Sequence, residues 1–469
     1  MALYKSPLPP FFKGGGSEDL QFIKGNRRSM CYFTPLKKRG RGDLSPFSVL
    51  SLFFLCLLLF TPLQAKPIEI ILWHSMAGNL GDEIQTLAKD FNGTQKEYVI
   101  KPIYKGGYIE SLTSFAAAFR AKQPPSLVQV FEVGTSTMLA PKGIIKPVDE
   151  LMQEQGLTLP ESDFFPAVRA YYSEQGHLMA MPLNTSVPSL FYNAAALAKV
   201  GYSAETFPRT WDEFEIMAAK LIAAGYPCAY TSAYPAWILI ESFSAIHGLA
   251  MIDPSSKKAI YNNKQVVNHL ERLRRWQRLH YFEYGGRSDD ATTLFTSGRC
   301  PLLSQSSGGY NSLAELLTFP VGVAALPLDS QASARRFNNV AGGAALWAVA
   351  GQTSLVYQGI AQFFNFLAQP EVQKKWHENT GYLPLGIEGI YKPLANDSKH
   401  LSLRLARSEF IGHQMGGPVL RIEAQNQIRT INDEALEIIF AGIKTPQQAM
   451  DDAVSRANHS LLRFARNSN

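Results

Sequence analysis

The sequence predicts an α/β protein with two lobes, and three observations support this fold class. Strand-like and helix-like segments alternate from residue 68 to residue 131, and the alternation resumes after residue 211. The chain of 469 residues is also long enough to fill more than one hydrophobic core. Strands that alternate with helices form parallel sheets joined by helical crossovers, so we expect each stretch to build one α/β lobe.

The first stretch shows two kinds of apolar spacing. Residues 127–131 (LVQVF) form a continuous apolar run of the kind that is buried on both faces of a sheet. Apolar residues between positions 80 and 91 recur every three or four residues, which indicates an amphipathic helix. We therefore expect strands at 68–73, 98–104 and 127–131, and helices at 80–91 and 109–119.

The second stretch and the C-terminal region continue the pattern. Thr210 precedes a helix-like segment and is a suitable N-cap, because its hydroxyl can accept from the first free N–H groups. We expect strands at 228–232, 300–304 and 340–349, and helices at 211–224, 265–280, 312–317, 357–368, 372–378, 427–441 and 446–465.

Residues 1–65 have the features of an N-terminal extension that ends in a secretory signal peptide. The basic cluster 37–41 precedes a 14-residue apolar run at 47–60, and small Ala65 marks the expected cleavage site. Such a run is short for a membrane-spanning helix, which needs about 20 residues, although an uncleaved anchor remains the alternative. The formal charge of +6 lies entirely in this segment, so the rest of the chain is neutral and nucleic-acid binding is not expected.

Two of the four cysteines, Cys228 and Cys300, lie after the expected cleavage site. Export permits them to form a disulfide, and the alternative is that both are buried and reduced. Neither a C-x-x-C motif nor a Cys/His cluster suggests a metal site, and we expect no cofactor.

Several strings spread over residues 66–469 resemble extracellular solute-binding proteins of the maltodextrin-binding type, and within that family the branch that binds glycerol phosphates. The strings shared with the wider family are 190–193 (LFYN), 207–214 (FPRTWDEF), 363–370 (FFNFLAQP) and 381–384 (GYLP). Those shared with the narrower branch are 73–76 (WHSM), 104–106 (YKG), 129–134 (QVFEVG), 306–308 (SSG), 375–377 (KWH) and 444–449 (KTPQQA).

The resemblance implies the two-lobed periplasmic binding protein fold of type II, with three crossings between lobes that close on a ligand. The crossings fall near 184–189, 338–343 and 391–398. Lobe 1 would then comprise residues 66–186 and 341–393, and lobe 2 residues 187–340 and 394–469. A cleft site agrees with the tendency of open α/β sheets to bind ligands beyond the carboxyl ends of their strands.

The resemblance also implies a set of ligand-binding residues. They are Tyr108, Glu132, Ser186, Ser306, Gly343, Tyr382 and Arg429, to which we add Trp237. Trp237 belongs to a pair of rings that the family builds from two tryptophans, and here Tyr234 takes the place of the second. The two rings are expected to form an apolar wall for the glycerol carbons.

The chemistry of these residues fits a phosphorylated polyol. Glu132 follows the buried strand and can accept hydrogen bonds from hydroxyl groups. Ser306 begins a small-residue turn (306–309) before an expected helix, where free N–H groups favour an anion. Arg429 can form a two-pronged, charge-assisted contact with phosphate. Its alternative is a surface salt bridge with Asp433 or Glu434.

The function implied is that of a periplasmic binding component that captures sn-glycerol 3-phosphate for an ABC permease with a cytoplasmic ATPase, and we expect it to be a monomer. Glycerophosphodiesters and oligosaccharides are alternative ligands. A secreted phosphatase is the alternative from another class, but no G-x-S-x-G, H-E-x-x-H or P-loop motif supports an enzyme.

Overall fold

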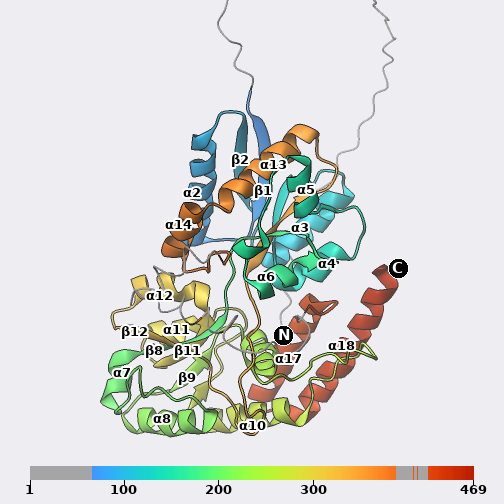
Figure 1. Cartoon of the computed structure of the whole chain (residues 1–469). Helices are drawn as coiled ribbons and strands as arrows, with labels where there is room; N and C mark the ends of the chain where they lie inside the picture. The colour runs from blue at the N-terminus through green and yellow to red at the C-terminus, as the bar shows by residue number, and fades with distance from the viewer. Residues whose placement is uncertain (1–65, 387–404, 406–408, 410–420, 469) are drawn as a thin grey trace, which may run out of the picture. The chain divides into compact units, whose positions relative to one another are not determined.

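The computed structural model describes residues 66–386, 405, 409 and 421–468 (Figure 1). The expected signal peptide, its cleavage site and the third crossing at 391–398 lie outside these residues. No helix within the described ranges is both long enough and apolar enough to cross a membrane.

The first sheet has six strands in the order β2-β1-β3-β13-β4, and β7 pairs with β13. Strands β1, β2 and β3 are parallel, as the alternation of strand and helix predicts, whereas β13 runs antiparallel to β3. The strands are β1 (Ile68–His74), β2 (Tyr98–Tyr104), β3 (Leu127–Phe131), β4 (Ile145–Lys146), β7 (Met181–Pro182) and β13 (Ala344–Val349).

Helices pack against this sheet through apolar faces. In α2, for example, the buried residues recur at helical spacing and pack against β2. Figure 1 shows α2 and the pair α13 and α14 beside β1 and β2. The helices of this part are α2 (Gly78–Thr94), α3 (Tyr108–Arg120), η1 (Glu132–Gly134), α4 (Thr135–Leu139), α5 (Val148–Glu154), η2 (Glu161–Asp163), α6 (Pro166–Tyr171), α13 (Ser354–Leu367) and α14 (Pro370–Thr380); a two-stranded sheet pairs β5 (Ser173–Glu174) with β6 (His177–Leu178).

The second sheet has five strands in the order β10-β9-β11-β8-β12. Strands β9, β10 and β11 are parallel, and β8 runs antiparallel to β11 and β12. The strands are β8 (Pro188–Asn193), β9 (Tyr230–Ser232), β10 (Phe282–Glu283), β11 (Leu302–Ser306) and β12 (Val321–Ala324).

The helices that accompany the second sheet include a π-helix, η3, and two long C-terminal helices, α17 and α18, which pack on each other (Figure 1). Thr210 caps α8 in a reciprocal capping box with Glu213, which confirms the predicted N-cap. The helices are α7 (Ala194–Lys199), α8 (Trp211–Ala223), η3 (Ala236–Ser242), α9 (Phe243–Ile246), α10 (Lys264–Arg278), α11 (Thr292–Thr296), η4 (Ser307–Gly309), α12 (Tyr310–Leu316), α17 (Gln425–Phe440) and α18 (Pro446–Ser468).

The chain passes between the two sheets twice within the described residues. It leaves the first sheet after β7 and enters the second at β8, and it returns between β12 and β13. Ser186 and Gly342 form a backbone bridge where these two passages meet. The expected strand 340–349 is therefore too long: β13 begins only at Ala344, because Gly343 has a φ of +101°, which an extended strand does not accommodate.

A disulfide joins Cys228 and Cys300 in the second sheet's core. Both cysteines are fully buried, one just before β9 and the other just before β11. Since β9 and β11 are adjacent parallel strands, the bond ties their N-terminal ends together. Of the two possibilities that the sequence left open, the structure contains the disulfide.

We expect the Cys228→Ser/Cys300→Ser variant to lose about 4 kcal/mol of unfolding free energy, because the bond closes a loop with a sequence separation of 72. Chemical denaturation of the mature chain measures the loss, and the denatured, unreduced wild type should show no free thiol. Two free thiols in the wild type would contradict the disulfide.

Candidate functional site

The predicted site residues lie at the ends of elements from both halves of the fold. Glu132 begins η1 directly after β3, and Ser306 is the last residue of β11. Tyr108 is the first residue of α3, whereas Ser186 and Gly343 lie in the two passages between the sheets. The remaining three are Trp237 in η3, Tyr382 just after α14, and Arg429 in α17.

Arg429 joins two buried carboxylates. Its Nη1 donates to Glu132 Oε1 at 2.5 Å, while Nε and Nη2 donate to the two oxygens of Glu241 at 2.9 and 2.6 Å. The expected alternative, a surface salt bridge to Asp433 or Glu434, is wrong, because the salt bridges of Arg429 go to Glu132 and Glu241 and Glu434 pairs with Arg456 instead. The guanidinium lies between the two halves of the fold, with one edge held by Glu241.

The cluster of Arg429, Glu132 and Glu241 contains more negative than positive charge. Arg429 is the one cation within salt-bridge distance of either carboxylate among the described residues, so the three groups carry a formal charge of −1. Burial raises the pKa of Glu132, and Glu241 adds to the rise, while Arg429 opposes it without cancelling it. Burial acts to lower the pKa of Arg429, but the two carboxylates outweigh burial and raise it. The guanidinium therefore stays charged, and Glu132 is the group whose ionisation the site disfavours.

Two further side chains extend the cluster. The Tyr171 hydroxyl donates to the carbonyl oxygen of Glu132 at 2.9 Å and lies 3.3 Å from Oε1 of Gln425. Gln425 Nε2 in turn donates to Glu241 Oε2 at 3.1 Å. The network thus runs from η1 and α6 of the first half to η3 and α17 of the second.

The two passages hold the site together through backbone contacts. Ser186 and Gly342 exchange two backbone hydrogen bonds, and the Glu132 N–H donates to the carbonyl oxygen of Gly343. A Cβ on Gly342 would lie 2.4 Å from the Trp237 ring, and one on Gly343 would lie 1.8 Å from the Asn184 carbonyl oxygen. Only glycine allows the passages to approach this closely.

Tyr382 packs on the turn that follows Ser306 at the end of β11. A Cβ on Gly308 would lie 2.4 Å from the Tyr382 ring, so the ring packs directly on the turn backbone. The Ser306 hydroxyl accepts from the Gly308 N–H at 3.2 Å. The helix expected at 312–317 begins earlier, as η4 followed by α12 at Tyr310, which brings this turn to the start of a helical segment.

Trp237 and Tyr234 form the expected pair of rings. Their centroids are 6.3 Å apart at 80°, an edge-to-face arrangement, and Trp237 is 5% exposed. Tyr234 has a φ of +44°, which is unusual for a residue other than glycine. The backbone of this turn is therefore held in a sparsely populated conformation at Tyr234.

Four residues of the site were not predicted from the sequence: Tyr171, Glu241, Asn184 and Gln425. Glu241 carried one usable signal, because it is a lone acid in the apolar string 236–243 (AWILIESF) and a buried acid needs a partner. The string alone does not identify Arg429 as that partner.

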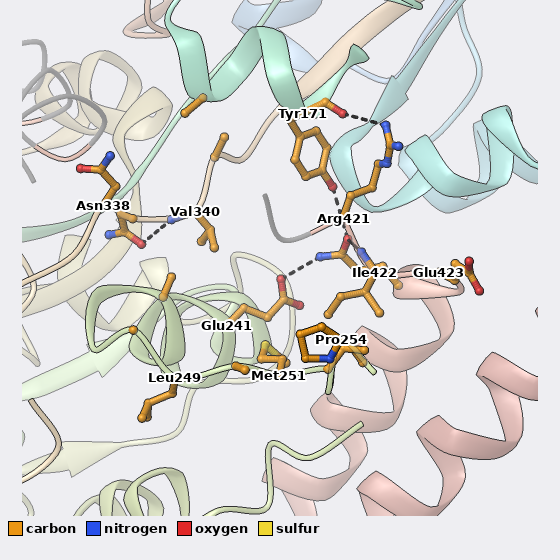
Figure 2. Close-up of a pocket in the computed structure, with 18 of the residues that line it drawn as sticks. Tyr171, Glu241, Leu249, Met251, Pro254, Asn338, Val340, Arg421, Ile422 and Glu423 are labelled. Atoms are coloured by element: carbon orange, nitrogen blue, oxygen red, sulfur yellow. Dashed lines mark hydrogen bonds between the residues drawn. The ribbon is translucent and has the colours of Figure 1, made fainter. Parts of the chain in front are cut away.

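A cavity of about 360 Å³ borders the network on one side. Figure 2 shows Tyr171, Glu241 and Arg421 around it, together with the second passage at 338–341. Of its described lining residues, none belongs to the predicted set of eight. We place the candidate site at the Arg429 cluster, because hydrogen-bonding groups from both halves of the fold converge there.

Comparison with known proteins identifies the family. The model of the bacterial extracellular solute-binding proteins matches residues 86–395. The chain is 39% identical over 425 residues to the sn-glycerol-3-phosphate-binding periplasmic protein UgpB of Salmonella typhimurium, covering 87% of this chain and 95% of the relative. The chain belongs to the bacterial extracellular solute-binding protein family. UgpB of Escherichia coli K12 is also 39% identical, over 84% of this chain and 92% of its own length.

Solved structures agree on the fold of this solute-binding protein. UgpB from Mycobacterium tuberculosis, in complex with glycerophosphocholine, superposes with a TM-score of 0.71 at 20% identity and covers 85% of this chain and 99% of its own. Maltose-bound MalE3 of T. maritima gives a TM-score of 0.70 at 17% identity, covering 83% and 99%. The predicted two-lobed fold of type II is thereby confirmed.

We expect Glu132→Gln to raise the thermal midpoint of the ligand-free solute-binding protein at pH 7 to 8. The pKa of Glu132 is raised by burial above its ordinary 4.5, so the folded state holds the proton more tightly than the unfolded chain. Wild-type stability is then lost as pH rises through the folded pKa, and the variant avoids this loss. The difference between the two proteins should shrink as pH falls toward 4.5, as thermal unfolding over a pH series would show.

The matched control is Glu97→Gln, which changes an exposed acid. A fall in the midpoint of Glu132→Gln at pH 7 to 8 would contradict the prediction, since it would mean that the ion pair with Arg429 outweighs the cost of burial.

Proposed function

We propose that this chain is the periplasmic binding component of an ABC importer and that it captures sn-glycerol 3-phosphate. The relatives named for this ligand share 39% identity with this chain over 84% to 87% of its length. The observation that carries the proposal is the position of Arg429, a buried cation whose Nη1 faces the first half of the fold while Glu241 holds its opposite edge.

The phosphate and the glycerol part of the ligand would contact different kinds of side chain. A phosphate monoester is largely dianionic at pH 7, because its second pKa is about 6, and it needs charged or N–H donors once water is removed. Arg429, the phenols of Tyr108 and Tyr382 and the hydroxyl of Ser306 supply such donors. Glu132 accepts from glycerol hydroxyls, and Trp237 covers the carbons. Ligand binding then exchanges the Arg429–Glu132 ion pair for contacts with the ligand.

In this proposal the protein acts in the periplasm as a monomer that docks on permease subunits powered by a cytoplasmic ATPase, after export through the signal peptide. It performs no chemistry on its ligand. The Ser75 hydroxyl is buried without a hydrogen-bond partner, so it forms no nucleophile–base pair with neighbouring His74. Burial also lowers the pKa of His74.

The charge of the site supports a second candidate ligand, a glycerophosphodiester. One guanidinium faces two carboxylates, so a dianion entering the site meets an excess of negative charge. A phosphodiester carries a single negative charge and costs less to place there. Titration of the mature chain against glycerol 3-phosphate, glycerophosphocholine and maltose separates the two phosphate ligands from an oligosaccharide.

We expect Arg429→Ala to weaken binding of glycerol 3-phosphate by about 100-fold or more. Each hydrogen bond to a charged group contributes about 1.5–3 kcal/mol, and the variant removes at least one such bond together with the site's cation. Arg429→Lys should recover part of the affinity, because an ammonium restores the charge but not the planar fork. Isothermal titration calorimetry measures both.

The matched control is Arg456→Ala, which removes an arginine paired with Glu434 on the surface of the same pair of helices. It should bind like the wild type. If Arg429→Ala, shown to be folded by circular dichroism, bound glycerol 3-phosphate as tightly as the wild type, the assignment of this site would be wrong. Release of phosphate from the ligand would instead support the phosphatase alternative.

A further inference from the structure

A chain of four hydrogen bonds leads from a backbone N–H through the phenol of Tyr108 to the sulfur of Met76. The Ser75 N–H donates to Gln129 Oε1 at 2.8 Å, and Gln129 Nε2 donates to Asn184 Oδ1 at 2.9 Å. Asn184 Nδ2 then donates to the Tyr108 hydroxyl oxygen at 3.0 Å, and that hydroxyl donates to Met76 Sδ at 3.7 Å. Gln129 is 1% exposed and Asn184 is fully buried.

The direction of this chain is fixed at its first member. Side-chain amides can be turned over, so their orientation follows from their partners. A backbone N–H can only donate, and it therefore requires the carbonyl oxygen of Gln129 on its side. The NH₂ group of Gln129 must then face Asn184, which in turn must present its own NH₂ group to Tyr108.

The consequence falls on the phenol. Because the Tyr108 oxygen accepts from Asn184, its proton must point elsewhere, and without ligand it reaches the sulfur of Met76, a weak acceptor. The ring itself is held by stacking on Phe131, with centroids 5.1 Å apart and planes at 5°. The Tyr108 ring is thus fixed in place, and its hydroxyl can donate a hydrogen bond to a ligand.

We propose that Gln129 and Asn184 are positioning residues that fix Tyr108 as a hydrogen-bond donor, so that the site selects a ligand group with acceptor oxygens only at this position. Phosphate oxygens meet that requirement, whereas the hydroxyl groups of a polyol do so only if their own protons are directed away. The inference rests on the proposed function, which places the ligand against Tyr108.

The same amide acts on Tyr382. Burial raises the pKa of Tyr382 to about 12, and the side chain of Asn184 opposes that rise. Burial likewise raises the pKa of Tyr108, again opposed by Asn184. Both phenols therefore remain protonated at neutral pH and keep the proton that a phosphate oxygen would accept.

The test is Gln129→Glu, a change two hydrogen bonds away from Tyr108. An ionised carboxylate accepts from Ser75 but cannot donate to Asn184, so the Asn184 amide must turn over and present Oδ1 to the phenol. The Tyr108 proton is then used internally. We expect the affinity for glycerol 3-phosphate to fall by about tenfold or more, as in Tyr108→Phe, because each variant removes one bond to a charged group.

A double-variant cycle separates this effect from added charge or damage to the fold. We call the hydrogen bonds from Ser75 through Gln129 and Asn184 to Tyr108 the relay. If the relay acts through Tyr108, Gln129→Glu should weaken binding by no more than about threefold in the Tyr108→Phe background. The neutral control Gln129→Met interrupts the chain without reversing it, and should lose less affinity than Gln129→Glu. If Gln129→Glu does not fold, Asn184→Asp, which places an acceptor directly opposite the phenol, takes its place in the same cycle.

Wild-type affinity for Gln129→Glu, or an equal loss with and without the Tyr108 hydroxyl, would overturn the relay while leaving the proposed function intact. If the wild-type protein bound neither glycerol 3-phosphate nor glycerophosphocholine, the proposed function would fail, and the relay with it. Coupling in the cycle supports the relay, since a merely structural role for Gln129 would not depend on the Tyr108 hydroxyl.

Discussion

The organisation of the site depends on one interaction: the largely buried guanidinium of Arg429 must be paired with carboxylates. Arg429 is 17% exposed, and a cation so far removed from water must be paired. Glu241 lies in the same half of the fold and satisfies one edge, so the charge stays compensated whatever happens across the site. Glu132, from the other half, supplies the second pairing, which in the proposed function is the one that a ligand replaces. The arrangement gives Arg429 one partner from its own half of the fold and one from the opposite half.

The balance of charge limits what can replace Glu132. With two carboxylates for one cation, the ligand-free site already disfavours full ionisation of Glu132, and an anion adds to that repulsion. Neutral donors are the means that remain for stabilising a phosphate. In the proposed function, the phenols of Tyr108 and Tyr382 and the hydroxyl of Ser306 provide them without adding charge. Selectivity then depends on the direction of hydrogen bonds as much as on electrostatic attraction.

Features of the fold that depend on neighbouring residues were predictable from the sequence, and contacts between residues far apart in the sequence were not. The buried run of β3 and the Thr210 cap depend on neighbouring residues, so spacing and residue type were enough to locate them. The strand expected at 340–349 was too long because the positive φ of Gly343 arises from its contact with Asn184 in the other passage. Arg429 contacts Glu132 and Glu241 across sequence separations of 297 and 188, and no local pattern reports such pairs. The resemblance to known binding proteins placed Glu132 and Arg429 at the site but not their bond to each other.

The two passages explain how distant residues can act on the same ligand group. Asn184 lies in the first passage, and its backbone carbonyl oxygen lies against Gly343 of the second, while its side chain reaches Gln129 and Tyr108 of the first half. The Glu132 N–H donates to the carbonyl oxygen of Gly343. Any movement of one half of the fold relative to the other must bend these two passages. The residues that set the hydrogen-bond direction at Tyr108 and the position of Glu132 therefore lie where the halves would pivot. Groups anchored there keep their geometry during such a movement, whereas Arg429, held by Glu241 in the second half, would travel with that half toward the ligand or away from it.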